Sequence, residues 1–155
     1  HRIQFIQTIT NIIAVAIENK RLFRNQVEQE RMNKEIELAK EVQNLLIPQS
    51  LPKGKNFEVS SIYKPHFNVG GDYYDCLTID KGRYLICLAD ISGKGVSAAL
   101  LMSNLQANLR QLTKQYSTLE HLVTQLNEAV FSITKGDRFL TFFIAEIDST
   151  ISPPR

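Results

Sequence analysis

Residues 3–46 contain neither proline nor glycine, and the first such residue of the chain is Pro48. Because both common helix breakers are missing, this segment predicts one continuous helix. At roughly 1.5 Å per residue the helix would extend about 65 Å. A helix of that length needs a partner to cover its apolar side chains, since packing supplies most of the stability of a helix in water.

Apolar side chains recur along this segment at the three- and four-residue spacing that is typical of a coiled coil. The positions that follow the pattern are Ile6, Ile9, Ile13, Ala16, Phe23 and Val27 and, after an offset, Met32, Ile36, Ala39, Gln43 and Leu46. The offset has the form of a stutter. Lys20 and Gln43 are polar residues in this seam, which would weaken the coil and allow its register to change. We therefore expect a parallel homodimer formed through the amino-terminal helix.

Two aspartates stand where a globular protein rarely places them. Asp90 ends the apolar run 84–89, which predicts a buried strand, and Asp72 follows two glycines. The turn signal at residues 80–82, Asp-Lys-Gly, predicts a hairpin that brings Asp72 and Asp90 together at one end of a sheet. The alternative is structural: Asp72 would cap a turn, and Asp90 would cap the helix that follows Gly95.

A pair of bare carboxylates repels. At about 4 Å and an effective dielectric constant near 20, the cost is roughly 4 kcal/mol, which is enough to raise one pKa or to recruit a cation. Oxygen-only ligands suit Mg²⁺ or Mn²⁺. The glycines beside the aspartates, which are Gly70, Gly71, Gly93 and Gly95, permit close backbone approach and sharp turns. The turn after Asp90 can expose the backbone carbonyl of Ile91 next to the metal.

The rest of the chain predicts two helices and one strand. Apolar spacing indicates a helix over residues 96–115, and Ser117 with Glu120 has the form of a capping box that opens a second helix over 118–133. Residues 140–147 are almost continuously apolar, which predicts a central strand. Together with the hairpin, these elements give a mixed α and β (α+β) fold class.

Four ordered blocks of sequence resemble the stage II sporulation protein E type of metal-dependent serine/threonine phosphatase, of the bacterial PPM superfamily. The blocks are residues 39–48 (Ala-Lys-Glu-Val-Gln-Asn-Leu-Leu-Ile-Pro), Leu51-Pro52, residues 69–75 (Val-Gly-Gly-Asp-Tyr-Tyr-Asp) and residues 90–102, which begin Asp-Ile-Ser-Gly-Lys-Gly. The resemblance covers about residues 36–148. It implies an αββα-sandwich phosphatase domain with a two-metal centre at one edge.

The same resemblance implies roles for individual residues. Asp72 and Asp90 would be metal ligands, Asp90 would bridge two Mn²⁺ or Mg²⁺ ions, and the Ile91 carbonyl would complete the second site. Asp75 would be a structural hydrogen-bond acceptor. Catalysis would proceed through metal-bound water, and the substrate would be a phosphoserine or phosphothreonine on a regulatory protein of the anti-sigma-factor antagonist type.

The family pattern continues to an Asp-Gly motif and a late aspartate, which are not found after Asp90. The later aspartates, Asp137 and Asp148, fit a turn and a strand end. We therefore expect an incomplete, truncated phosphatase domain over residues 47–155 that is inactive by itself. Residues 5–24 also resemble the last helix of a GAF sensor domain, which gives three segments: a GAF-like helix (1–24), a coiled-coil linker (25–46) and the phosphatase part.

Composition narrows the remaining function classes. The net charge of +2 and pI near 8.6 are too mild to indicate a nucleic-acid partner. No apolar run is long enough to cross a membrane, so we expect a cytoplasmic protein. Cys76 and Cys87 fit small core residues rather than nucleophiles.

Two other functions stay open at this stage. A coiled-coil dimerisation and partner-binding module without catalysis would lose nothing if Asp72 or Asp90 were replaced. The residues 70–74, Gly-Gly-Asp-Tyr-Tyr, are also similar to the signature of diguanylate cyclases, although the acidic segment that those enzymes carry upstream is missing.

Overall fold

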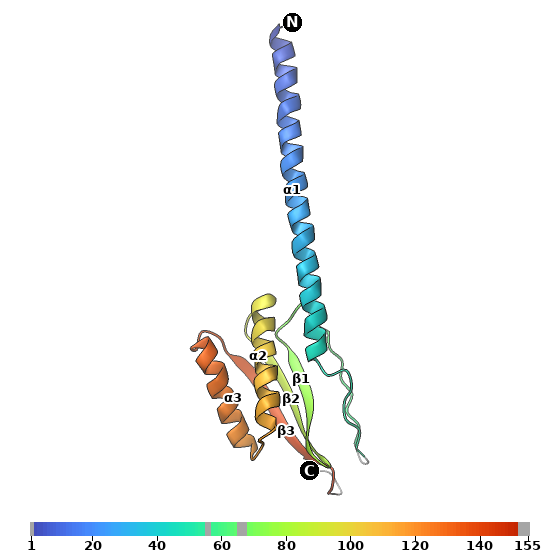
Figure 1. The fold of residues 1–155 in the computed structure, drawn as a ribbon, viewed down its shortest axis with the longest axis vertical. Coiled ribbons are helices and arrows are strands. Elements are labelled where there is room, and N and C mark those ends of the chain that lie inside the picture. Colours follow the sequence, from blue (N-terminus) through green and yellow to red (C-terminus); the bar gives the residue numbers. More distant parts are fainter. Residues whose placement is uncertain (1, 55–56, 65–67, 152–155) are drawn as a thin grey trace. The chain divides into compact units, whose positions relative to one another are not determined.

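The computed structural model describes residues 2–54, 57–64 and 68–151. By its contacts the chain divides into two compact units, His1–Leu38 and Ala39–Arg155. The elements run in the order α1 (Arg2–Leu46), β1 (Tyr73–Asp80), β2 (Arg83–Ile91), α2 (Val96–Thr113), α3 (Leu119–Thr134) and β3 (Leu140–Asp148) (Figure 1). No helix in the described part of the chain has the length and apolar character needed to cross a membrane.

The first unit is a single stretch of helix, because α1 begins at Arg2 and passes through the whole unit. Its apolar side chains are exposed, among them Ile6, Ile9, Ile13 and Phe23. The predicted uninterrupted helix is therefore confirmed.

The second unit contains a three-stranded antiparallel sheet in the order β1-β2-β3. β1 and β2 form the predicted hairpin, with Tyr73 opposite Ala89 at one end and Asp80 opposite Arg83 at the turn. Gly82 has a φ of 90° in that turn, a conformation that suits glycine. β3 pairs with β2 and lies at an edge of the described sheet, so the prediction of a central strand was wrong. Its apolar sequence reflects burial of one face by helices, while Phe143 on the other face is exposed.

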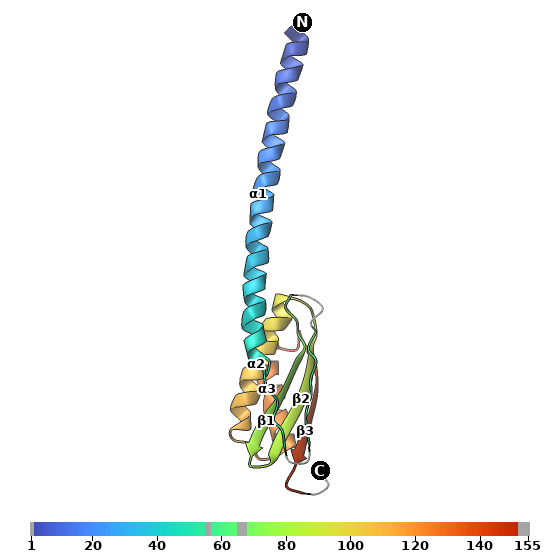
Figure 2. The ribbon, with the colours of Figure 1, turned by 90° about the vertical axis from the view of Figure 1, so that its right-hand side faces the viewer.

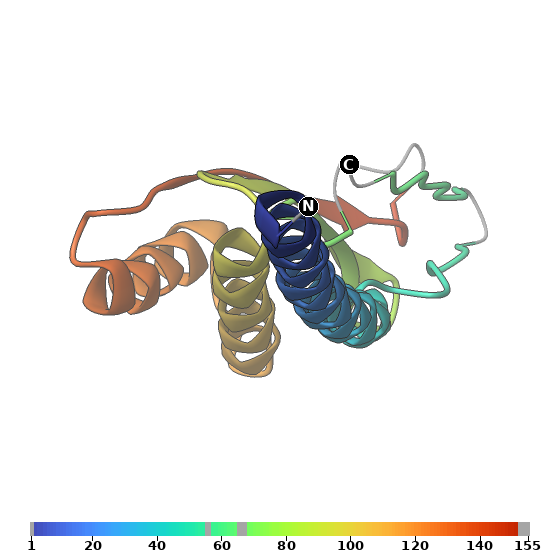
Figure 3. The same ribbon diagram turned by 90° about the horizontal axis from the view of Figure 1, so that it is seen from above.

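Helices α2 and α3 cover one face of the sheet (Figures 2 and 3). Alternate residues of the strands point toward them, as the period of a strand requires. The core consists of buried apolar residues from these layers: Tyr73, Leu85, Cys87, Ala89, Ile91, Ala98, Met102, Leu105, Leu109, Leu122, Leu126 and Val130, joined by Ile47 after α1. Burial raises the pKa of the Cys87 thiol to about 12, which fits a small core residue.

The start of α3 differs from the predicted capping box. Thr118 is the N-cap residue, and its hydroxyl accepts a hydrogen bond from the backbone N–H of His121 at 3.2 Å. Ser117 lies one position too early to cap the helix. Thr118 has an extended backbone, as is typical of an N-cap residue. Because serine and threonine are both good N-cap residues, the sequence spacing alone indicated the wrong one.

The opposite face of the sheet is partly covered by the segment 57–64. The ring of Phe57 packs edge-on against Tyr84 with centroids 5.0 Å apart, and the ring of Tyr63 lies 6.2 Å from that of Tyr74. Leu88 and Phe143 remain exposed on this face. One end of the face carries the two aspartates.

Candidate metal centre

The hairpin register brings Asp72 and Asp90 together. Tyr73 pairs with Ala89, so the next position along each strand places Asp72 across from Asp90. The pKa of Asp72 is raised from its ordinary value by partial burial and by the negative charge of the nearby Asp90. The two carboxyl groups therefore lie near each other at one end of the hairpin, where both line the same groove.

A backbone carbonyl lies beside this pair. A methyl group placed on Gly71 would lie 2.9 Å from the carbonyl oxygen of Ile91, a contact that real side chains do not make. The carbonyl of Ile91 thus lies directly against the backbone that leads into Asp72. Gly71 is needed for this close approach, and it is not among the glycines with positive φ.

The loop after Ile91 turns sharply through two glycines, Gly93 with a φ of 107° and Gly95 with a φ of 69°. Gly95 is the N-cap residue of α2, with no side-chain cap. Asp90 lies within β2 and does not cap the helix, so the structural alternative for Asp90 is wrong.

The residues just before β3 hold this loop, a connection that the sequence did not indicate. The backbone N–H of Ser92 donates to the carbonyl of Phe139 at 2.9 Å, and the Ser92 hydroxyl accepts from the N–H of Phe139 at 3.1 Å. The Arg138 guanidinium donates to the carbonyl of Ser92 at 3.4 Å. Since Ser92 follows Ile91 directly, these contacts fix the place of the Ile91 carbonyl.

Asp75 is buried, with 2% of its surface exposed, and has a structural role. Its carboxylate accepts hydrogen bonds from the Tyr73 hydroxyl at 2.6 Å, the Cys76 N–H at 2.9 Å and the Arg110 Nε at 2.9 Å. These partners come from β1 and α2, so Asp75 ties the hairpin to the helix layer. It points to the helix side, away from Asp72 and Asp90.

A groove of about 690 Å³ runs along the two aspartates on the outer face of the sheet. Tyr63 and Lys64 line it together with the apolar side chains of Leu88 and Phe143. The Tyr63 hydroxyl donates to the backbone carbonyl of Asp72 at 3.2 Å. Lys64 brings a positive charge to a groove that holds two negative ones. No pattern in the sequence indicated that Tyr63 and Lys64 would lie beside the aspartates.

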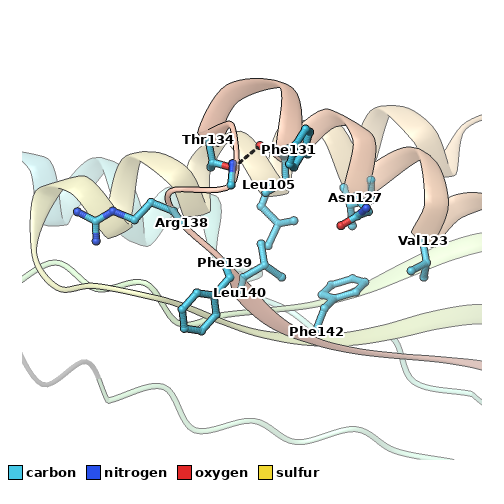
Figure 4. Close-up of a pocket in the computed structure, with 12 residues that line it drawn as sticks. Leu105, Val123, Asn127, Phe131, Thr134, Arg138, Phe139, Leu140 and Phe142 are labelled. Atoms are coloured by element: carbon cyan, nitrogen blue, oxygen red, sulfur yellow. Dashed lines mark hydrogen bonds between the residues drawn. The ribbon is translucent and has the colours of Figure 1, made fainter.

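A separate cavity of about 300 Å³ lies between α3 and the first residues of β3 (Figure 4). Its walls are mostly apolar, with Asn127, Thr134 and Arg138 as polar members. Neither Asp72 nor Asp90 lines it. Its mostly apolar walls fit a gap in side-chain packing rather than a metal site.

The coiled-coil pattern predicted Gln43 in a seam between two helices, and the structure places it elsewhere. Its side chain is buried, with 5% of the surface exposed, and it forms two hydrogen bonds to the backbone of Gly70. The heptad reading of this position was therefore wrong. Gln43 belongs to the second unit, where the end of α1 packs on the loop before β1.

The donors at the centre fit a hard divalent cation, because two carboxylates and a carbonyl supply only oxygen atoms. Within residues 2–54, 57–64 and 68–151, however, no group of three or more His, Cys, Asp or Glu side chains is placed to hold a metal ion. Asp137 and Asp148 do not join the pair: Asp137 lies in the turn after α3, and Asp148 ends β3 with its carboxylate bound by Thr150.

Comparison with known proteins agrees with the resemblance. Residues 80–151 match the model of the stage II sporulation protein E (SpoIIE) family. Phosphoserine phosphatase RsbU of Bacillus subtilis (strain 168) is 31% identical over 117 residues, which are 76% of this chain and 35% of RsbU. Phosphoserine phosphatase RsbP of the same organism is 28% identical over 120 residues, which are 74% of this chain and 29% of RsbP.

The fold also has a solved relative. The SiaA-PP2C domain of Pseudomonas aeruginosa superposes with a TM-score of 0.65 at 20% identity, covering 78% of this chain and 50% of that domain. The chain spans about a third of the length of the two Bacillus phosphatases. Over residues 80–151 this chain is thus similar to the stage II sporulation protein E family, and it shares its fold with a PP2C domain.

Proposed function

We propose that this chain supplies metal-binding residues of a Mg²⁺- or Mn²⁺-dependent serine/threonine protein phosphatase. The observation that carries the proposal is the convergence of Asp72, Asp90 and the Ile91 carbonyl at one end of the hairpin. Asp72 and Asp90 are the residues that would hold the cations. Gly70, Gly71, Gly93 and Gly95 form the loops that let the ligands approach.

The bound cations would lower the pKa of a water molecule and neutralise charge on the phosphoryl group. The residues of this chain would bind the cations and hold the ligand atoms in place. The Asp72 and Asp90 carboxylates accept the cations, the Ile91 carbonyl stays in place through the hydrogen bonds of Ser92, and the groove beside them has room for a phosphorylated segment. No protein nucleophile is required. With two acidic ligands in the described part of the chain, these 155 residues alone would be inactive or nearly so.

The substrate class follows from the relatives, which are named phosphoserine phosphatases. We infer a phosphoserine or phosphothreonine on a regulatory protein, of the kind that antagonises an anti-sigma factor in a partner-switching pathway. The amino-terminal residues fit a signalling arrangement: a GAF-like sensor helix over 1–24, a coiled-coil linker that begins at residue 25, ends before the second unit and forms a homodimer, and the phosphatase segment over 47–155. The location would be the cytoplasm.

The test is Mn²⁺ binding by calorimetry, followed by hydrolysis of a phosphoserine protein by a longer chain that supplies the remaining metal ligands. Asp90→Asn keeps the size of the side chain and removes a charged ligand, so Mn²⁺ affinity should fall by at least about 10-fold. Asp72→Asn should behave alike. Asp80→Asn is the matched control, since Asp80 lies at the far end of the hairpin and pairs with Arg83 at 3.0 Å; it should leave Mn²⁺ affinity unchanged.

The rival function is a dimerisation and partner-binding module without catalysis, and the lack of a three-ligand group among the described residues favours it. Under this alternative the unsubstituted chain takes up no Mn²⁺, and Asp72→Asn and Asp90→Asn leave all properties as they were. That result would exclude the proposed phosphatase.

A further inference from the structure

The carboxamide of Gln43 pairs with both polar groups of the Gly70 backbone. Gln43 Nε2 donates to the Gly70 carbonyl at 2.7 Å, and the Gly70 N–H donates to Gln43 Oε1 at 3.0 Å. This is the pairing that a neighbouring strand would provide. Gly70 precedes β1 and has no strand partner in the described sheet, so one side chain satisfies a backbone that would otherwise lose its hydrogen bonds on burial.

The next residue is held from the other side. A Cβ atom on Gly71 would lie 2.9 Å from the Ile91 carbonyl oxygen and 3.2 Å from the Cβ atom of Ala98. The two glycines are therefore fixed in turn, Gly70 by a side chain of α1 and Gly71 by the end of β2 and the start of α2. Asp72 follows at once, and its backbone position is determined by these contacts.

The end of α1 that carries Gln43 is itself anchored. Gln49 Nε2 donates to the Asn44 carbonyl at 2.7 Å, and Gln106 Nε2 of α2 donates to the Leu46 carbonyl at 3.5 Å. These carbonyls belong to the last turn of a helix, where no backbone partner is available. Ile47 is buried in the core directly after the helix. Gln43 thus projects from a fixed base.

We propose that Gln43 is a positioning residue of the metal centre: its carboxamide holds the Gly70 backbone in place, and this sets Asp72 at the distance from Asp90 and the Ile91 carbonyl that a shared cation needs. The inference rests on the proposed function. Gln43 touches neither a cation nor a substrate. Its contribution is to hold a ligand-bearing loop, and outer partners of this kind change metal affinity by roughly 10- to 100-fold.

The experiment compares two buried glutamines, Gln43 at the end of α1 and Gln106 in α2. Gln43→Leu removes both bonds to Gly70 and keeps an apolar side chain of similar size. Gln106→Leu is the matched control, because Gln106 is also buried and its side chain donates to the Leu46 carbonyl of α1 rather than to Gly70. Gln43→Glu is a second variant that keeps an acceptor oxygen but places a carboxylate oxygen against the Gly70 carbonyl. Each is measured by Mn²⁺ titration, by thermal unfolding without metal and by hydrogen exchange without metal.

Gln43→Leu and Gln43→Glu should weaken Mn²⁺ binding by roughly 10- to 100-fold, while Gln106→Leu lowers stability and leaves Mn²⁺ affinity within about 2-fold. In the metal-free chain, the Gly70 amide should exchange at least about 5-fold faster in Gln43→Leu only. Equal effects of Gln43→Leu and Gln106→Leu on affinity, or no change in Gly70 exchange, would overturn the inference. If the unsubstituted chain binds no Mn²⁺, the proposed function fails instead, and the exchange rates still decide whether Gln43 holds the loop.

Discussion

Asp75 shows at the scale of a single residue how a buried charge is stabilised. One oxygen accepts from the Cys76 N–H, and the other accepts from both the Tyr73 hydroxyl and Arg110. Asp75→Asn keeps the shape but leaves one acceptor oxygen for three donors. We expect the free energy of unfolding to fall by about 1–3 kcal/mol, measured by urea denaturation at neutral pH. Asp137→Asn, in an exposed turn, is the control, and an equal loss in both variants would contradict this role.

The residues of the candidate centre differ in how far the sequence could predict them. The meeting of Asp72 and Asp90 follows from local signals, namely a hairpin turn and the alternation of the strands. Gln43 could not be placed in this way, because a heptad position is compatible with a second helix and equally with a loop of the same chain. Its partner is Gly70, which is distant in sequence, and only the folded packing brings them together.

At the scale of the element, substitutions at the start of α3 can distinguish two candidate N-cap residues, Thr118 and Ser117. Thr118→Ala removes the side-chain acceptor for the His121 N–H, so the protein should lose about 1 kcal/mol of stability. Ser117→Ala, one residue earlier, should leave stability unchanged within experimental error. Thermal unfolding of both variants measures the difference. A larger loss for Ser117→Ala would restore the capping box that the sequence indicates.

The elements themselves were largely predictable. The long helix, the hairpin and the two later helices follow from periodicity and from turn residues, and their ends shift by only a few positions. The place of β3 was not predictable, because an apolar strand next to a helix layer and an apolar strand inside a sheet have similar sequences. The contact between Ser92 and Phe139 was not predictable for the same reason, because it depends on the pairing of β2 with β3.

At the scale of the whole molecule, the exposed apolar face of α1 predicts self-association. Ile9 and Ile13 are 40% and 53% exposed and lie on the predicted seam. Ile9→Lys with Ile13→Lys should shift the chain from dimer to monomer in sedimentation equilibrium, because charges in a seam are desolvated and repel. Gln7→Lys with Asn11→Lys adds the same charge outside the seam and should leave the dimer intact. A monomeric unsubstituted chain would exclude the proposed homodimer.

The glutamine anchors at the end of α1 have one more consequence. Gln43, Gln49 and Gln106 hold this turn through carboxamides, which carry no charge and do not titrate. Dissolved salt screens ion pairs but has little effect on hydrogen bonds between neutral groups. These hydrogen bonds at the helix end should therefore depend little on ionic strength or pH. They would persist when osmotic or acid stress changes the salt concentration or the acidity inside a cell.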